Sequence, residues 1–170
     1  MKFNYKKILI IGCGGSGKST LARQMGEKFA LPVVHLDKIY WLPNWVKKNS
    51  DQFDKELLEE LQKEKWIIDG NFTRTFKTRL SYADLCIFLD YSTDLCLQSV
   101  FERVKKYKGK TRPDMTEGCP EQADEEFIDW IKSYNDNVRP EFLEILKNSN
   151  VPYLIFNSRK QTSEWLNSFD

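Results

Sequence analysis

A glycine-rich run near the N-terminus carries the clearest signal for chemistry in this sequence. Residues 12–19 read GCGGSGKS and fit the pattern G-x-x-x-x-G-K-S/T at every fixed position. In this pattern, backbone N–H groups turn inward around phosphate oxygens, and the positive end of the following helix adds to their effect. The residues predicted to bind phosphates are Gly12, Gly14, Gly15, Ser16, Gly17, Lys18, Ser19 and Thr20.

Two side chains of this run have specific roles in a polyphosphate site. We expect Lys18 to reach the β- and γ-phosphates and the hydroxyl of Ser19 to ligate Mg²⁺. A flexible turn without a ligand would need the glycines but neither of these side chains. The run therefore predicts nucleotide binding, with ATP and Mg²⁺ as the cofactors.

A carboxylate is needed beside this loop to hold the water shell of the metal, and two apolar runs end in an aspartate. Asp69 follows residues 66–68 and precedes a turn that contains a cation, Arg74. Asp90 follows residues 85–89 and is equally well explained as a helix cap or turn residue. Asp69 is therefore the predicted metal ligand and a predicted catalytic residue.

Arg103 and Arg112 are the candidate catalytic cations in a basic stretch of the chain. A planar guanidinium can hold a phosphate at two places, and phosphoryl transfer needs positive charge over the moving γ-phosphate. A loop that closes with such an arginine would also exclude water. For the lysines around them, a solvated surface is the simpler interpretation.

The predicted acceptor-side residues follow the second apolar run, at the edge where open α/β sheets bind ligands. Asp37 could accept a proton from an acceptor hydroxyl or hold metal-bound water. The aromatic side chains there could stack on a planar ligand, or they could only pack this segment onto its own helix. His35 is expected to be a buried, hydrogen-bonded side chain. The predicted substrate-binding set is Asp37, Tyr40, Trp41, Trp45, Asn71, Arg74 and Arg79.

Short apolar runs alternate with longer amphipathic stretches along the chain. The runs lack clean polar alternation, which is typical of strands covered on both faces. Their alternation with helical patterns predicts an α/β fold in one domain, residues 1–170, with a parallel sheet and helices on both faces. The expected strands are residues 7–11, 33–36, 66–68, 85–89 and 153–156, and the expected helices are 18–29, 51–65, 75–83, 93–107, 123–148 and 161–169.

Two long segments interrupt this alternation and suggest covers over a site. Residues 37–50 are too long and too aromatic for a tight connection, and a helix follows them, so a flap is expected over about residues 37–65. Residues 108–122 are rich in Gly, Pro and charge, which predicts a mobile lid. In the last long helical pattern, Pro140 indicates either a kink or the first turn of a second helix.

The overall composition excludes several other classes of protein. The 26 Lys and Arg residues against 25 Asp and Glu give a formal net charge of +1, so no global field attracts nucleic acid or a membrane. The 4 cysteines at wide spacings and the single histidine offer no common zinc-ligand spacing. With neither a signal-peptide pattern nor a membrane span expected, the sequence favours a cytoplasmic protein with reduced cysteines. It leaves the oligomeric state open.

These motifs together resemble the DNA topology modulation protein (FlaR-like) family, which belongs with the adenylate-kinase-like P-loop kinases. The resemblance spans nearly the whole chain. It is carried by residues 12–20, 35–37, 40–41, 43–45, 68–71, 109–115 and 117–120.

The resemblance implies a nucleoside-monophosphate-kinase-like, three-layer αβα fold with a five-stranded parallel sheet in the order 2-3-1-4-5. It also implies an acceptor-side flap, a lid with Arg103 and Arg112 as lid-side arginines, and an adenine-side loop at residues 157–160 that includes Arg159. No Thr-Gly-Asp-Met-Leu-Arg-like segment for AMP is present. The near-neutral chain gives no physical support for binding duplex DNA.

The leading functional hypothesis is an Mg²⁺·ATP-dependent phosphotransferase acting on a small acceptor, either a nucleoside or nucleotide or a hydroxyl metabolite. The alternative is a nucleotide-binding regulatory protein with little turnover, in which ATP closes the lid and exposes a surface to a partner. A GTPase is disfavoured because the sequence has no Asn-Lys-x-Asp segment. The position of Asp37 favours a hydroxyl acceptor over a phosphate acceptor.

Overall fold

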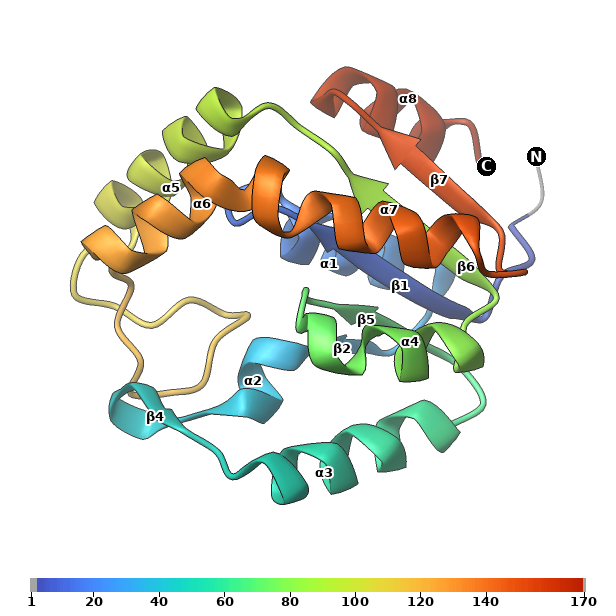
Figure 1. Cartoon of the computed structure of the whole chain (residues 1–170), viewed down its shortest axis with the longest axis horizontal. Helices are drawn as coiled ribbons and strands as arrows, with labels where there is room; N and C mark the ends of the chain where they lie inside the picture. The colour runs from blue at the N-terminus through green and yellow to red at the C-terminus, as the bar shows by residue number, and fades with distance from the viewer. Residues whose placement is uncertain (1–2, 170) are drawn as a thin grey trace.

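The protein is built around one parallel sheet, seen in a computed structural model that describes residues 3–169 (Figure 1). The sheet order is β2-β5-β1-β6-β7, and each neighbouring pair is parallel. When only the strands of this sheet are counted along the chain, the order reads 2-3-1-4-5. The predicted fold class is confirmed. The strands are β1 (Lys7–Gly12), β2 (Val33–His35), β5 (Trp66–Asp69), β6 (Leu85–Leu89) and β7 (Tyr153–Phe156).

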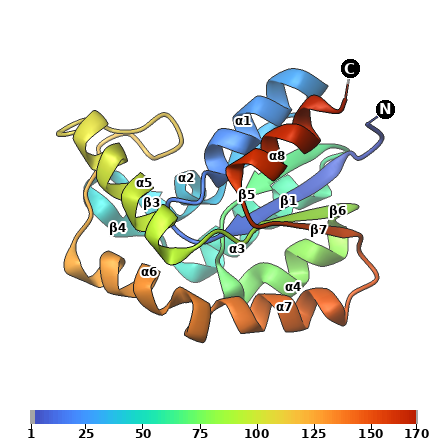
Figure 2. The same cartoon turned by 90° about the horizontal axis from the view of Figure 1, so that it is seen from above.

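Helices cover both faces of the sheet, which makes three layers. Figure 2 shows α1 and α8 on one face and α4 and α7 on the other. The helices are α1 (Lys18–Phe29), α2 (Leu36–Tyr40), α3 (Ser50–Gln62), α4 (Thr73–Tyr82), α5 (Thr93–Lys106), α6 (Glu125–Asn137), α7 (Arg139–Lys147) and α8 (Arg159–Asn167). In the described part of the chain, no helix is both long enough and apolar enough to span a membrane.

The core lies along the central strands, as their continuous apolar sequences predict. The side chains of β1 from Ile8 to Ile11 are fully buried, and β6 is buried along its whole length. Phe76 from α4 and Phe142 from α7 pack edge to face on one side of the sheet, with their ring centroids 4.7 Å apart. This rigid core fixes the strand ends, where the loops that carry the polar residues begin.

Several element boundaries differ slightly from the sequence prediction, and two of them have a clear local reason. The helical pattern over 123–148 forms two helices, which is one of the two predicted alternatives: α6 ends at Asn137, and α7 begins at Arg139 with Pro140 in its first turn. Proline fits a first turn because its missing N–H has no helical partner there. The expected strand over 33–36 ends one residue early, since Leu36 begins α2.

The flap consists of α2, a small hairpin and α3. The hairpin strands β3 (Trp41–Leu42) and β4 (Val46–Lys47) are antiparallel, and a 3₁₀ turn, η1 (Pro43–Trp45), joins them. Asn49 caps α3, because its Oδ1 accepts a hydrogen bond of 2.8 Å from the backbone N–H of Asp51.

The predicted lid, residues 108–122, folds back on itself and lies against the flap (Figure 1). Isolated β-bridges join Lys108 to Glu121 and Thr111 to Pro120. Thr116 Oγ1 donates a hydrogen bond of 2.7 Å to the carbonyl of Trp41 in the hairpin. The Cys119 thiol donates to the carbonyl of Leu42 at 3.2 Å, and the N–H of Asn44 donates to the carbonyl of Gly118 at 3.0 Å.

Candidate functional site

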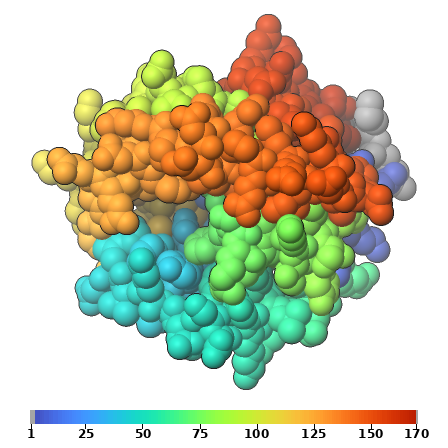
Figure 3. Space-filling model, in the orientation of Figure 1, coloured from blue at the N-terminus to red at the C-terminus, as the bar shows by residue number. Residues whose placement is uncertain are grey.

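A cavity of about 700 Å³ opens at the edge of the sheet where β1, β2 and β5 end. Its walls come from the loop after β1, the flap, the lid and the start of α6, and Figure 3 shows the hollow between α6 and the flap. The structure thus brings together segments that are far apart in the sequence. The predicted site residues that line the cavity are Gly14, Gly15, Lys18, Ser19, Asp37, Tyr40, Trp41, Trp45, Asp69, Asn71, Arg103 and Arg112.

The loop after β1 has the compact backbone of a phosphate-binding loop. Gly15 has a φ of 82°, and a Cβ at this position would lie 2.3 Å from the carbonyl oxygen of Cys96. The side chain of Asn71 accepts a hydrogen bond of 3.1 Å from the N–H of Gly12, which ties this loop to the turn after β5. Four predicted loop residues do not line the cavity: Gly12, Ser16, Gly17 and Thr20.

Lys18 begins α1 and turns back over the loop. Its Nζ donates hydrogen bonds of 2.9 Å to the carbonyls of Gly12 and Cys13. Burial lowers the pKa of Lys18, while the nearby groups of Cys13, Asp69 and Asp37 raise it. The ammonium is therefore a buried cation that can exchange carbonyl partners for phosphate oxygens.

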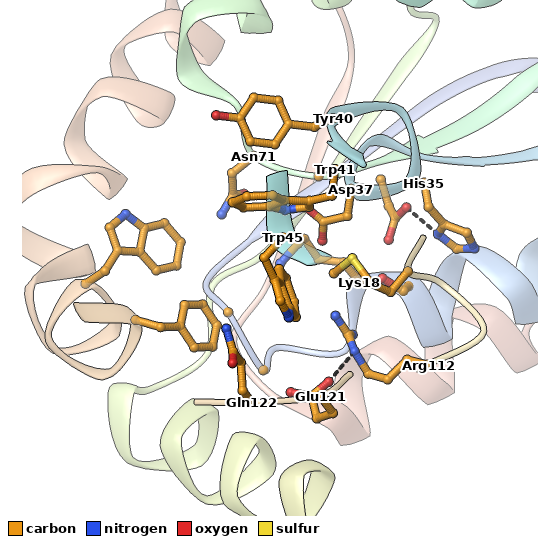
Figure 4. A pocket seen from close by; sticks show the side chains of 18 of the residues that line it. Lys18, His35, Asp37, Tyr40, Trp41, Trp45, Asn71, Arg112, Glu121 and Gln122 are labelled. Carbon is orange, nitrogen blue, oxygen red and sulfur yellow. Dashed lines mark hydrogen bonds and ion pairs between the residues drawn. The ribbon is translucent and has the colours of Figure 1, made fainter. Parts of the chain in front are cut away.

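Asp69 lies at the end of β5, beside the loop. It is 3% exposed, and its Oδ1 is 2.6 Å from Nδ1 of His35, its parallel neighbour on β2 (Figure 4). His35 thus has the hydrogen-bonded position that the sequence predicts, although the identity of its partner was not predicted. The pairing fixes the Asp69 carboxylate beside the loop.

The donor set suits Mg²⁺ bound together with a nucleotide better than a metal held by protein alone. The described residues contain no group of three or more His, Cys, Asp or Glu side chains that could hold a metal. Ser19, which carries a hydroxyl, and Asp69, which carries a carboxylate, both line the cavity. Mg²⁺ commonly binds through one or two such oxygens while phosphates and water complete its shell.

Asp37, in the first turn of α2, is the second carboxylate of the cavity. Burial raises its pKa, as does the negative charge of Asp69, and the cations Arg112 and Lys18 partly offset the rise. Asp37 therefore lies among the P-loop lysine, a lid arginine and the predicted metal ligand. A carboxylate with a raised pKa in such a place can accept a proton.

Arg103 and Arg112 line the cavity, and one carboxylate holds both of them. Arg103 Nε donates to Oε1 of Glu121 at 3.0 Å, and Arg112 Nε forms an ion pair with Oε2 of the same residue. Arg112 also bonds Asp114 at 2.7 Å, and Asp114 pairs with Arg23 of α1. Sequence reasoning missed Glu121 and Asp114, although the acidic half of the lid was the available signal.

The aromatic residues of the flap both line the cavity and pack locally. The ring of Tyr40 lies 5.7 Å from that of Phe53 in α3, and the ring of Trp41 lies 5.3 Å from that of Trp45. Local packing, one of the two interpretations that the sequence left open, is therefore seen, and stacking on a planar ligand stays a prediction. Helix α6 adds Phe127 and Trp130, and Gln122 precedes it on the same cavity wall. Neither Phe127 nor Trp130 was among the predicted site residues.

The structure places two predicted substrate-binding arginines away from the cavity. Arg74 lies on the exposed side of α4 and forms a two-bond ion pair of 2.6 and 2.8 Å with Asp54 of α3. Arg79 is 0% exposed, and its guanidinium donates to the carbonyls of residues 70–72. The guanidinium of Arg74 is thus paired with the carboxylate of Asp54, and the guanidinium of Arg79 stabilises the turn after β5 by hydrogen bonds to its carbonyls.

Two further residues have structural partners. Arg159, predicted on the adenine side, does not line the cavity and donates a hydrogen bond of 2.5 Å to the hydroxyl of Ser99 in α5. Asp90, the alternative metal ligand, is held by two bonds of 2.7 Å from Arg139. Asp90 is therefore held by an ion pair, and the cap of α5 is Ser92 rather than Asp90.

The fold and the loop geometry define a chain with the fold of P-loop kinases. It is similar to shikimate kinase from Bacteroides thetaiotaomicron (TM-score 0.58, 18% identity, 97% of this chain and 96% of that chain). It is also similar to shikimate kinase from Acinetobacter baumannii in complex with shikimate (TM-score 0.62, 14% identity, covering 96% of this chain and 89% of that chain). A third similar structure is deoxyadenosine kinase from M. mycoides (TM-score 0.55, 15% identity, covering 95% of this chain and 96% of that chain).

The chain belongs to the same family as the uncharacterized protein YqaC of Bacillus subtilis (strain 168). The two are 30% identical over 135 residues, which cover 77% of this chain and 74% of that protein. No protein-family model matches the sequence. The finer resemblance to topology modulation proteins stays a prediction, because the shikimate kinase and deoxyadenosine kinase structures support the P-loop kinase fold alone.

Proposed function

We propose that this protein transfers the γ-phosphate of Mg²⁺·ATP to a hydroxyl group of a small acceptor. The observation that carries the proposal is the position of Asp37. This carboxylate lines the same cavity as the P-loop, Arg103 and Arg112, and it interacts electrostatically with Lys18, Asp69 and Arg112.

The nucleotide end of the cavity has the groups needed for phosphoryl transfer. Backbone N–H groups of the loop and the ammonium of Lys18 would hold the β- and γ-phosphates. Arg103 and Arg112 would place positive charge over the phosphate in transit. Ser19 and Asp69 would hold Mg²⁺, which when bound neutralises phosphate charge.

Asp37 would act as the general base. The acceptor oxygen attacks the γ-phosphorus, its proton passes to the Asp37 carboxylate, and the bond to the β–γ bridging oxygen breaks to release ADP. The raised pKa of Asp37 makes it a better proton acceptor than an ordinary aspartate. The closed lid and flap would keep water away from the phosphorus.

A hydroxyl acceptor agrees with the charges of the site better than a phosphate acceptor does. An acceptor phosphate needs cations to orient it, and the two arginines predicted for that task, Arg74 and Arg79, are engaged elsewhere. The similar structures are named as kinases of shikimate and deoxyadenosine, both of which are hydroxyl compounds. AMP is accordingly not the proposed acceptor.

The test is transfer of labelled phosphate from ATP to a panel of nucleosides, ring alcohols, sugars and nucleoside monophosphates. We expect a hydroxyl compound to be the substrate, and Asp37→Asn to lower kcat by about a hundredfold or more because it removes the base. Arg74→Ala, outside the cavity, is the matched control and should be close to normal. Good monophosphate substrates, with Arg74→Ala crippled and Asp37→Asn near normal, would contradict the proposal.

A nucleotide-binding regulatory role is the second candidate. It is favoured by the ion pairs of Glu121, because they occupy both arginines that phosphoryl transfer would need. In that case ATP would bind tightly and close the lid, while no compound of the panel would be phosphorylated. The same transfer assay therefore separates the two candidates.

A further inference from the structure

The tip of the flap holds Trp45 in an unusual backbone conformation. Asn44 and Trp45 have φ angles of 63° and 60°, so two consecutive residues other than glycine occupy the left-handed region. Such strain persists only where the surrounding structure enforces it, and it is concentrated at functional sites. Here the lid contacts the strained backbone, because the carbonyl of Gly118 accepts a hydrogen bond of 3.0 Å from the N–H of Asn44.

This conformation directs the indole of Trp45 into the cavity rather than into solvent. In the view of Figure 4, Trp45 lies between Trp41 and Asp37 on one side and Gln122 and Glu121 on the other. Its ring meets that of Trp41 edge to face, with centroids 5.3 Å apart and an interplanar angle of 78°. The indole therefore forms part of the cavity wall.

The indole N–H of Trp45 lacks a hydrogen-bond partner. Within residues 3–169, its Nε1 is one of the buried side-chain atoms for which no partner exists. A buried donor left unpaired is costly, and native structures contain few of them. In the wall of a ligand-sized cavity, such a donor indicates a ligand that supplies the missing acceptor atom.

The groups around this donor favour a planar, uncharged ligand. Phe127 and Trp130 stack with centroids 6.0 Å apart and line the same cavity. Gln122 also lines it, and its carboxamide has no partner in the described part of the chain, so it can both donate and accept. Arg103 of α5 and Arg112 of the lid are both paired with Glu121, and Lys47 is an exposed residue of the flap hairpin.

We infer that Trp45 is a specificity-determining residue for a planar heterocyclic acceptor of the nucleoside type. Its N–H donates a hydrogen bond to an oxygen or unprotonated nitrogen at the edge of the heterocycle, and the aromatic walls pack against the faces of the ring. The Gln122 carboxamide completes the recognition. This inference rests on the proposed phosphotransfer and names the chemical class of its acceptor.

The test measures binding, so that it does not depend on turnover. Dissociation constants of uridine, inosine, myo-inositol and glucose are measured by calorimetry with a non-hydrolysable ATP analogue and Mg²⁺ present. We expect at least one nucleoside to bind more tightly than both polyols. Trp45→Phe keeps an aromatic ring but removes the N–H, and should weaken nucleoside binding about tenfold.

Two further variants guard against a change that is merely structural. Trp165→Phe removes an indole N–H in α8, where the ring packs against Phe156 and Phe169 away from the cavity, and should leave binding unchanged. Gln122→Ala changes an exposed residue and should weaken nucleoside binding several-fold. A melting temperature for each variant confirms that it is folded.

Unchanged nucleoside affinity in Trp45→Phe, tighter binding of a polyol than of either nucleoside, or no nucleoside binding at all would overturn the inference. The proposed function fails separately. If nucleosides bind through Trp45 but receive no phosphate from ATP, phosphotransfer is wrong while the recognition is right. If a polyol is phosphorylated and Trp45→Phe is normal, phosphotransfer is right and this inference is wrong.

Discussion

Arg79 shows how one buried charge can shape the site without entering it. Its guanidinium lies fully buried beneath the turn after β5 and donates to the carbonyls of Gly70 and Phe72 at 3.1 Å. The same turn carries Asn71, whose side chain accepts from the N–H of Gly12 in the P-loop. Arg79 therefore positions the P-loop through the turn. The sequence predicted that Arg79 binds substrate, because residue type alone does not distinguish an arginine that supports a turn from one that contacts a ligand.

Glu121 has the opposite effect, because it neutralises charge inside the cavity. We predict that Glu121→Gln strengthens ATP binding several-fold, since Arg103 and Arg112 lose the carboxylate that holds them and become free to contact phosphates. Calorimetric titration with Mg²⁺·ATP measures the effect. Asp54→Asn is the matched control, since it frees Arg74 outside the cavity and should leave the affinity unchanged. Weaker ATP binding in Glu121→Gln would show that the carboxylate orients the arginines instead.

Among the elements, the sequence predicted those marked by a local pattern of residues and not the contacts between distant segments. The strands of the sheet and the P-loop followed from continuous apolar runs and a fixed motif. The lid and flap were recognised as irregular segments, but their mutual contacts were not predicted. Those contacts end on backbone carbonyls, such as that of Trp41, which any residue could provide. No side-chain pattern marks such a contact.

The hydrogen bonds between lid and flap predict that the two segments respond together to nucleotide. We expect a non-hydrolysable ATP analogue to protect the amides of both residues 108–122 and residues 38–47 from hydrogen exchange. Thr116→Val removes the hydroxyl that bonds the carbonyl of Trp41 at 2.7 Å, and should keep protection of the lid while reducing that of the flap.

Ser81→Ala is the control for this experiment. It removes a hydroxyl of α4 that bonds the carbonyl of Thr78, and the exchange pattern of this variant should match that of the unmodified protein. Equal protection of the flap in Thr116→Val and in the unmodified protein would show that the two segments close independently.

For the whole molecule, the parallel sheet decides where chemistry can occur. The carboxyl ends of β1, β2 and β5 bring the P-loop, Asp37 and Asp69 to one edge, as the fold class predicts. The contribution of α6 could not be predicted in the same way. Phe127 and Trp130 have the spacing of an ordinary amphipathic helix, and only the tertiary fold turns part of that face toward the cavity.

The central claim is that Asp37 accepts the proton of a hydroxyl acceptor, and the pH dependence of transfer tests it most directly. Burial and the charge of Asp69 raise the pKa of Asp37 above the ordinary value of 3.8. The base works only when deprotonated, so the rate should fall as the pH falls through this raised pKa. We predict that kcat/KM for the acceptor shows an acid limb above the pH of an ordinary carboxyl group. In Asp37→Asn, the rate should be low and this limb should be absent. The same acid limb in Asp37→Asn, at a rate near that of the unmodified protein, would contradict the account.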